Sequence, residues 1–440
     1  MSILAFDSAL LGPLLSDAEI AGLLDDRAQL RAMLAFEAAL ARAEGRVGVI
    51  PEAAAARIAA VAETLEVDPA SLAEGTARDG IPVPALVAAL RKAVGGEAAA
   101  YVHWGATTQD VMDTGLLLRL RAILGLLDTR LAALGDRLAA LAEAERGTVM
   151  LARTRGQQAT PTSFGLKVAG WLAPLDRHRD RLKELRPRLE VLSFGGAAGN
   201  LSALGHAAIA VEETLAELLD LPAPAMPWHS QRDNLVELAD WLGLVSGSLG
   251  KMAGDILLMC QNEVGELREG AGGGSSTLPQ KQNPVRSEAV LSLTRHVAGL
   301  AGPMQLTAFH AHERDGVAWQ LEWLTLPQMV VATGAALLQS QALIGGLKVD
   351  RARMRANIEA THGLALAEAA SFALSRHLPR PEAQALVKQA CRDALAHGRP
   401  LMTLLQARCD APLDWHALAD PARHIGAADT FIDRVLAARH

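Results

Sequence analysis

The middle of the chain consists of long stretches whose apolar residues recur at helical spacing. Residues 111–145 carry leucines at a coarse heptad spacing, and further long helices are predicted after the turn at 226–234, at 285–308 and at 319–345. No stretch alternates between apolar and polar residues as a half-buried strand does. Alanine and leucine dominate the apolar residues, and aromatic residues make up only 3% of the chain. The predicted fold class is therefore all-α, built on a long central helical bundle.

Glycines and prolines divide this helical pattern into segments. We predict an N-terminal helical domain at 1–108, the central bundle at 109–346, and a small C-terminal helical domain at 347–440, where prolines shorten the helices. Within the first domain, one helix is expected to end near Gly45 and the next to begin at Pro51.

The composition excludes several classes of function. The net charge of −7 is mild and no basic stripe is visible, which argues against a nucleic-acid partner. Three widely spaced cysteines form neither a disulfide framework nor a zinc pattern, and the start of the chain lacks the basic region of a signal peptide. Residues 323–347 carry no charge, but their proline and three glutamines favour a core helix over a membrane span. We expect a cytoplasmic protein without membrane contact.

Residues 272–288, GGGSSTLPQKQNPVRSE, interrupt the helical pattern. Their glycines and prolines exclude a helix interior, so they predict a long loop between two helices. A loop of this length is usually either functional or a flexible linker. Ser275 and Ser276 supply hydroxyls, Lys281 supplies a cation and Asn283 supplies an amide. This combination suits an anionic substrate that gains or loses a proton.

Three other polar clusters stand out. In AYVHWGATTQDVMDTG (100–115), the residues His103, Thr107 and Thr108 precede a helix and serve either as its cap or as an anion site. RTRGQQATPTSFG (153–165) predicts either a polar turn before a helix that begins near Thr162 or a carboxylate-binding segment. In HAHERDG (310–316), Arg314 is either a carboxylate anchor or part of a solvated charge cluster.

Three of these segments resemble the three signature regions of the fumarase/aspartase superfamily and occur in the same order along the chain. GSSTLPQKQNP at 274–284 matches the pattern GSSxMPxKxNP with leucine in place of methionine, HWGATTQD at 103–110 resembles the first signature, and TRGQQATPTSFG at 154–165 resembles the second. Within the superfamily the chain is most similar to the 3-carboxy-cis,cis-muconate cycloisomerase family, through VHWGATTQDVMDTG and ERDGVAWQLEW at 313–323. Adenylosuccinate lyases are the nearest family to exclude.

The resemblance implies a homotetramer whose central domains form a 20-helix bundle, with each active site built from three subunits. It implies no metal and no organic cofactor. The expected substrate is a small di- or tricarboxylate from the protocatechuate branch of the β-ketoadipate pathway of aromatic degradation. A 3-sulfo analogue of the muconate is also compatible with a site rich in arginine and lysine.

The resemblance also implies roles for residues at matching positions. Ser275 is expected to transfer the carbon-bound proton, with Lys281 and Glu288 as further catalytic residues. Lys281 and Asn283 hold the substrate carboxylate and stabilise the negative charge of the intermediate. The other positions expected to bind substrate are His103, Thr107, Thr108, Arg155, Gln157, Ser276 and Arg314.

One position departs from the pattern of the superfamily lyases. Arg155 occupies the place of their histidine, whose glutamate partner is present as Glu288. A cycloisomerase uses a carboxylate with a pKa near about 4 as its nucleophile, which needs no proton-transfer partner at pH 7. We therefore favour lactonisation, with Arg155 either orienting that carboxylate or pairing with Glu288.

Two alternatives remain from the sequence. A lyase that releases fumarate, such as adenylosuccinate lyase, predicts a histidine after Thr154 and an additional basic set for a phosphate, and neither is clear. A non-catalytic member of the superfamily predicts an eroded loop, whereas Ser275, Lys281, Asn283 and Glu288 are all present.

Overall fold

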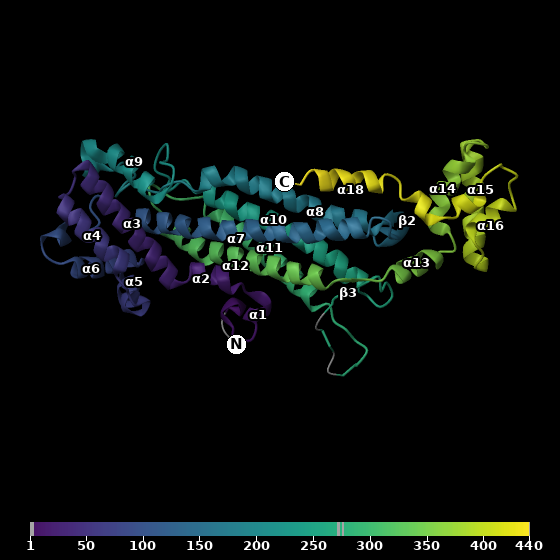
Figure 1. Ribbon diagram of the computed structural model, residues 1–440, viewed down its shortest axis with the longest axis horizontal. Coiled ribbons are helices and arrows are strands. Elements are labelled where there is room, and N and C mark those ends of the chain that lie inside the picture. The colour runs from purple at the N-terminus through teal and green to yellow at the C-terminus, as the bar shows by residue number, and fades with distance from the viewer. Residues whose placement is uncertain (1–3, 271–272, 275–276, 440) are drawn as a thin grey trace. The chain divides into compact units, whose positions relative to one another are not determined.

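The computed structural model describes residues 4–270, 273–274 and 277–439 (Figure 1). Helices dominate throughout these ranges, which confirms the all-α prediction. The described strands form two small two-stranded sheets, β1 with β2 and β3 with β4.

The first group of helices comprises α1 (Gly12–Leu15), α2 (Ala18–Leu24), α3 (Asp26–Val47), α4 (Glu52–Thr64), α5 (Ala73–Asp79) and α6 (Val83–Val94). The long helices are α7 (Thr108–Ala144), α8 (Phe164–Leu189), α10 (Asp233–Met259), α11 (Val285–Leu306) and α12 (Gly316–Gly346), with the shorter α9 (Ala208–Leu219) between α8 and α10. The last group comprises α13 (Arg351–Glu359), α14 (Ala367–Leu374), α15 (Arg380–His397), α16 (Leu401–Gln406), α17 (Trp415–Leu418) and α18 (Ala428–Ala437). The strands are β1 (Val149–Thr154), β2 (Gln157–Ser163), β3 (Leu267–Arg268) and β4 (Lys348–Val349). Single turns of 3₁₀-helix lie at Ala5–Asp7, Pro69–Leu72, Glu97–Tyr101, Ser202–Ala207, Leu364–Leu366 and Pro421–His424.

Helix α3 runs past the glycine at which the sequence predicted its end. The Asp25 side chain caps its start by accepting a hydrogen bond from the Ala28 N–H, and Gly48, with φ +81°, ends it. Gly45 lies inside the helix instead, because a Cβ there would come within 2.5 Å of the Ala55 Cβ on α4. The glycine therefore permits the close packing of α3 on α4, and the predicted stop at Gly45 is wrong.

The segment between α7 and α8 is a β-hairpin rather than the predicted polar turn. β1 and β2 pair antiparallel, with Thr154 opposite Gln157, so Arg155 and Gly156 alone form the turn. Both turn residues have positive φ, +52° and +78°, as a two-residue hairpin turn requires. Helix α8 then begins at Phe164 rather than near Thr162.

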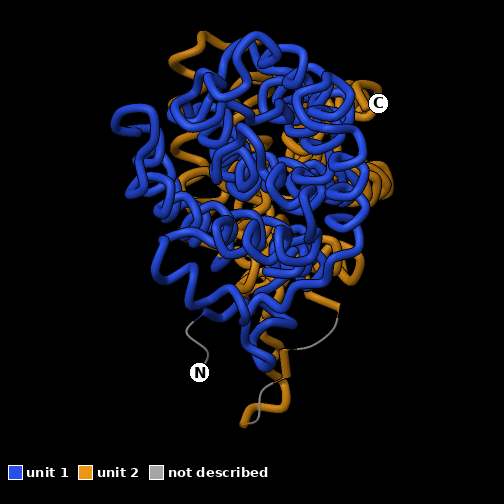
Figure 2. Tube along the Cα trace, turned by 90° about the vertical axis from the view of Figure 1, so that its left-hand side faces the viewer, with its two compact units in different colours: residues 1–130, 178–247, 292–338 blue, residues 131–177, 248–291, 339–440 orange. Residues whose placement is uncertain are grey.

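The chain divides into two compact units, shown in different colours in Figure 2. Unit 1 comprises residues 1–130, 178–247 and 292–338, and unit 2 comprises 131–177, 248–291 and 339–440. In unit 1 a large apolar core includes Phe36 of α3, whose ring lies 6.4 Å from that of Phe194. In unit 2 a separate core joins α14, α15 and α16. The three sequence domains, with boundaries at 108 and 346, are a different division and stay a prediction.

Two described helices, α10 and α12, are long and apolar enough to cross a membrane by length and composition alone. Most of the apolar window of α12, 72%, is buried inside the protein. The uncharged stretch at 323–347 therefore belongs to a core helix, as the sequence predicted.

Candidate active site

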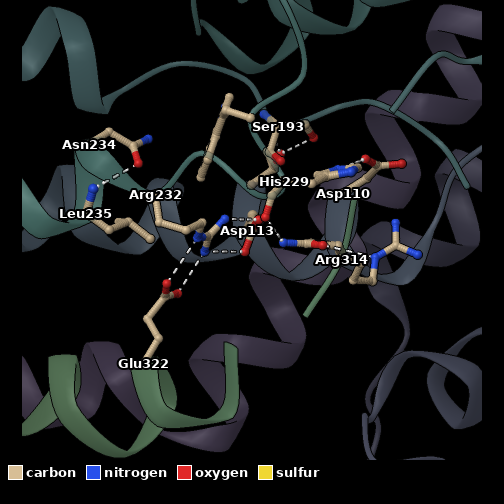
Figure 3. Close-up of polar contacts among 12 residues, drawn as sticks. Asp110, Asp113, Ser193, His229, Arg232, Asn234, Leu235, Arg314 and Glu322 are labelled. Atoms are coloured by element: carbon tan, nitrogen blue, oxygen red, sulfur yellow. Dashed lines mark hydrogen bonds and ion pairs between the residues drawn. The ribbon is translucent and has the colours of Figure 1, made fainter. Parts of the chain in front are cut away.

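The start of α7 is fixed by the carboxylate of Asp110, which is fully buried. Its Oδ2 accepts a hydrogen bond from the Thr107 N–H at 2.8 Å. Asp110 is the third residue of α7 and Thr107 is the residue before the helix, so this is the side-chain contact of a capping box. The same carboxylate accepts bonds from the N–H groups of Gly195 (2.8 Å) and Gly196 (3.1 Å). It also accepts a bond from His229 Nε2 at 2.7 Å (Figure 3). Three segments that are distant in sequence thus meet at one buried charge.

Arg314 is held against this helix start. Its Nε donates to Gln109 Oε1 at 3.0 Å, and its Nη2 donates to the Gly196 carbonyl at 3.4 Å. Gln109 is itself buried and donates to the His229 carbonyl at 2.8 Å. The guanidinium is therefore oriented by the same two segments that Asp110 joins.

His103 lies before α7 with a backbone φ of +61°, which is unusual for a residue with a side chain. Its Nδ1 lies 2.6 Å from Oε1 of Glu37, a buried residue of α3. Burial alone would lower the pKa of His103, but the carboxylates of Glu37 and Asp110 outweigh that effect and raise it. Thr107 and Thr108 are half-buried beside it. Unit 1 thus brings together His103, Thr107, Thr108, Gln109, Asp110 and Arg314, which we call the α7 cluster.

A second buried charge network lies one turn further along α7. The Arg232 guanidinium pairs with both oxygens of Asp113, at 2.6 and 3.1 Å, and with both oxygens of Glu322 on α12, at 2.8 and 3.1 Å (Figure 3). Burial would lower the pKa of Arg232, but the two carboxylates raise it above its usual value. The network fixes the turn at 226–234 against α7 and α12.

Unit 2 carries the hairpin and the signature loop, which we define as residues 272–284. Arg155 and Gln157 are exposed at the tip of the hairpin. Arg153 makes a two-bond ion pair with buried Glu266, at 2.7 and 2.8 Å. Asn357 donates to the same carboxylate at 2.8 Å. The hairpin is therefore tied, close to its turn, to the residue that precedes β3.

The signature loop is closed at its base by backbone contacts. The Asn283 N–H donates to the Gly273 carbonyl at 2.7 Å, and Gly274 pairs with Gln282 in an antiparallel bridge. A Cβ at Gly273 would lie 2.0 Å from the Asn283 carbonyl oxygen, so only glycine fits. Ser275 and Ser276 lie outside the described residues, while Lys281 is exposed and Asn283 is half-buried.

Glu269 joins this base to the start of α11. Its buried carboxylate accepts bonds from the Arg286 N–H (3.0 Å) and from the N–H (2.9 Å) and hydroxyl (2.6 Å) of Ser287. A carboxylate at a helix N-terminus is favourable because it meets the unpaired amides and the helix dipole. Glu288 follows in the first turn and is exposed, and within the described part of one chain no ion pair joins it to Arg155.

The described residues contain no group of three or more histidine, cysteine or acidic side chains placed to hold a metal ion. What they do present is a set of side chains in unit 1 that can donate hydrogen bonds, and a lysine, an amide and the hairpin arginine in unit 2.

A model of the lyase family matches residues 17–299 of this chain, and a model described as the adenylosuccinate lyase C-terminus matches residues 363–435. The chain belongs to the fumarase/lyase superfamily. The resemblance found in the three signature regions is thereby confirmed.

Within the superfamily, the chain is 47% identical to the 3-carboxy-cis,cis-muconate cycloisomerase of Pseudomonas aeruginosa, over 96% of this chain and 95% of that protein. It is 44% identical to the enzyme of the same name from Bradyrhizobium diazoefficiens, over 98% of each. The crystal structure of the 3-carboxy-cis,cis-muconate lactonizing enzyme from Pseudomonas putida shares its fold with a TM-score of 0.92 and 42% identity over 98% of each chain.

Sequence reasoning missed several residues that support the site of this superfamily member. They are Glu37, Asp110 as a buried acceptor, His229, Arg232, Glu266 and Glu269. A signal existed for Asp110, because its place three residues after a threonine is that of a capping box. The partners of the others lie far away in sequence, so no local pattern identifies them.

Proposed function

We infer that this protein is a cycloisomerase that converts 3-carboxy-cis,cis-muconate to 4-carboxymuconolactone in aromatic degradation. The observation that carries this conclusion is the 44–47% identity to enzymes of that name over nearly the whole chain. The carboxylate-binding donors of the α7 cluster support it, because the substrate carries three carboxylates.

The reaction is an isomerisation of the acid; because the attacking carboxylate is already ionised, the anion takes up one proton, which the donor passes on and then recovers from solvent. An oxygen of one substrate carboxylate forms a bond to a carbon of the conjugated double bond. The π-electron pair of the double bond then moves toward a second carboxylate. A proton is then delivered to the carbon next to that carboxylate. We assign this proton to Ser275. We assign to Lys281 and Asn283 the stabilisation of the negative charge of the intermediate, which a cation and a hydrogen-bond donor can provide.

The α7 cluster is proposed to bind a substrate carboxylate through His103, Thr107, Thr108 and Arg314. Arg314 supports this role because Gln109 and Gly196 already orient its guanidinium. A donor that is oriented before the substrate arrives loses less freedom on binding. Gln157 and Ser276 are proposed to complete the binding site.

Arg155 is proposed to orient the attacking carboxylate or to pair with Glu288. Because a carboxylate with a pKa near about 4 is already ionised at pH 7, a histidine that removes a proton is not needed at this position. This argument favours lactonisation over the cleavage of a carbon–nitrogen bond, whose leaving amine must be protonated.

The assembly is proposed to be a cytoplasmic homotetramer in which each active site combines signature regions from three subunits. Support comes from the division of the proposed site residues between the α7 cluster in unit 1 and the hairpin and signature loop in unit 2. No cofactor is proposed, since the addition needs only proton transfer and charge stabilisation.

The test is an ultraviolet assay of the purified protein with 3-carboxy-cis,cis-muconate, beside one with adenylosuccinate, each repeated with Ser275→Ala. The proposal expects loss of the conjugated-diene absorbance with the muconate and little turnover in the variant. Release of fumarate from adenylosuccinate without muconate turnover would establish the lyase alternative instead. A 3-sulfo analogue, assayed in the same way, distinguishes the substituent at position 3.

A further inference from the structure

The His103–Glu37 contact joins a proposed substrate-binding side chain to a buried carboxylate. Glu37 is 1% exposed, and the His103 side chain is 14% exposed. Because a carboxylate only accepts hydrogen bonds, the 2.6 Å contact makes His103 Nδ1 the donor. The described residues give the other ring nitrogen, Nε2, no hydrogen-bond partner. The contact thus fixes one edge of the ring and leaves the other edge available.

A second glutamate, Glu44, lies seven residues further along α3 and hence on the same face of the helix. It is fully buried, and neither of its carboxyl oxygens has a hydrogen-bond partner. Burial, and then the nearby charge of Glu37, raise the pKa of Glu44 to about 9. Glu44 is therefore protonated and uncharged at neutral pH, whereas Glu37 has His103 as a hydrogen-bond partner.

The other charges around His103 come from two further helices. Asp110 on α7 favours the protonated ring, while Arg91 on α6 opposes it. Arg91 is directed elsewhere by a hydrogen bond from its Nη2 to the Val102 carbonyl at 3.2 Å. The charge of Asp110 is shared among four donors. Glu37 is the only one of these groups that contacts the ring, so it dominates both the orientation and the charge of His103.

We propose that Glu37 is a positioning residue that keeps His103 protonated, with its Nε2–H directed at a carboxylate of the substrate. This proposal rests on the proposed function, because it assumes that the α7 cluster binds substrate. The buried Glu37 carboxylate requires a positive partner, since an unpaired buried charge is strongly disfavoured. The imidazolium supplies it, and its remaining N–H makes a charge-assisted hydrogen bond that a neutral ring with Nε2 unprotonated cannot donate.

The positive φ of His103 supports the same conclusion. A residue with a Cβ is held in this region only where the surroundings fix it, and such residues concentrate at ligand sites. Gly105, two residues later, also has positive φ and lies so close to Leu204 that a Cβ would approach the Leu204 side chain to 2.7 Å. The backbone and the Glu37 contact therefore fix the ring together.

The experiment compares Glu37→Gln with a matched control on the same helix, Glu44→Gln. Both changes replace a buried carboxyl by an amide of the same shape, but only Glu37 touches His103. In the Glu37 variant at pH 8 we expect KM to rise about tenfold with kcat nearly unchanged. This is the effect expected from losing one charge-assisted hydrogen bond to the substrate. The increase should shrink as the pH falls toward 6, because a larger fraction of the ring is then protonated even in the absence of the Glu37 carboxylate. The control should keep the KM of the parent enzyme.

A second readout does not depend on turnover. Deuterium exchange at the imidazole C2 carbon, followed by mass spectrometry of peptides, gives the pKa of His103 in the intact protein. We expect that pKa to fall in Glu37→Gln and to stay the same in Glu44→Gln. If the muconate is not the substrate, this measurement still tests the Glu37 contact, and the steady-state comparison is repeated with whichever substrate the enzyme turns over.

Three outcomes overturn the proposal: a His103 pKa that is equal in both variants, a KM increase that is the same at pH 6 and pH 8, or a loss confined to kcat. Should Glu37→Gln fail to fold, the comparison moves to Glu37→Asp, which keeps the charge and is expected to retain a raised His103 pKa. In a His103→Gln background, Glu37→Gln should change KM no further if it acts through His103 alone.

Discussion

The α7 cluster of unit 1 and the signature loop of unit 2 are held in place by different kinds of contact. In the α7 cluster, one buried carboxylate accepts hydrogen bonds from Thr107, Gly195, Gly196 and His229, and a second contact fixes Arg314. In the signature loop, backbone contacts join Gly273 to Asn283 at the base and the Lys281 N–H to the Leu278 carbonyl, and Glu269 caps the helix α11 that follows. Lys281, farther along the loop, is exposed.

This contrast indicates a division of roles. Substrate carboxylates are best recognised by donors whose direction is set in advance, because a fixed donor needs little reorganisation. The group that delivers the proton is expected on the signature loop, where Lys281 and Asn283 accompany Ser275. Substitutions in the α7 cluster should therefore change mainly substrate binding and stability, and substitutions in the loop should change mainly the chemical step.

The largest expected effect is on the chemical step. Ser275→Ala should lower kcat by about 10²–10⁴-fold, the usual contribution of a positioned proton donor, with a small change in KM. Steady-state kinetics with 3-carboxy-cis,cis-muconate measures both quantities. Ser276→Ala, at a proposed substrate-binding position, should instead raise KM and change kcat less than Ser275→Ala does. A larger loss of kcat in Ser276→Ala would move the proton-transfer role to Ser276.

Stability should respond more strongly in the α7 cluster than at the base of the loop. Asp110→Asn replaces a buried, paired charge, and we expect the free energy of unfolding to fall by about 3–5 kcal/mol. Glu269→Gln keeps an oxygen that still accepts from the α11 amides, and should cost about 1–3 kcal/mol. Urea unfolding of both variants gives the comparison. Equal losses would contradict the difference between the two regions.

Arg314→Lys tests substrate binding in the α7 cluster. Lysine keeps the charge but loses the planar group that contacts Gln109 and Gly196, so KM should rise about 10–100-fold while kcat changes little. Glu313→Gln, an exposed neighbour, serves as the control for local charge. A fall in kcat at constant KM would assign Arg314 to the chemical step instead.

The smallest expected effect is a pH dependence of stability from Glu44. Its folded pKa of about 9 lies above the ordinary value of 4.5, so between these values the folded protein binds one proton more than the unfolded chain. The free energy of unfolding should therefore fall by about 1.4 kcal/mol per pH unit as the pH rises. Glu44→Gln removes this contribution. The difference in the free energy of unfolding between the variant and the parent, measured by urea unfolding, should therefore shift in favour of the variant by about 1.4 kcal/mol between pH 6 and pH 7. A difference independent of pH would show that Glu44 is already ionised.

Much of the fold follows from local sequence. Apolar spacing identified the long helices, because each buries one face along its whole length. The β1–β2 hairpin was missed because the Arg155–Gly156 turn uses an arginine at a position with positive φ, where asparagine or glycine is the usual signal. Gly45 was taken for a helix end because its reason for being glycine lies on the neighbouring helix α4.

The residues of the candidate site likewise fall into a group that the sequence reveals and a group that it does not. Motif residues such as His103, Thr107 and Arg314 stand in short polar segments that the sequence displays directly. Their supporting partners do not: Asp110 and His229 are 119 residues apart, and Glu37 and His103 are 66 apart. Such pairs form only when the helices pack, so single-sequence patterns carry no signal for them.

The most direct test of the central claim is to mix two impaired variants, His103→Asn from the α7 cluster and Ser275→Ala from the signature loop, and to assay them at a muconate concentration well below KM. If each active site combines these regions from different subunits, unfolding and refolding the mixture should produce assemblies with some intact sites and raise muconate turnover above that of either variant alone. Tagging each variant differently confirms that mixed assemblies form. Mixed assemblies without any recovered activity would contradict the account, because both residues would then come from the same chain.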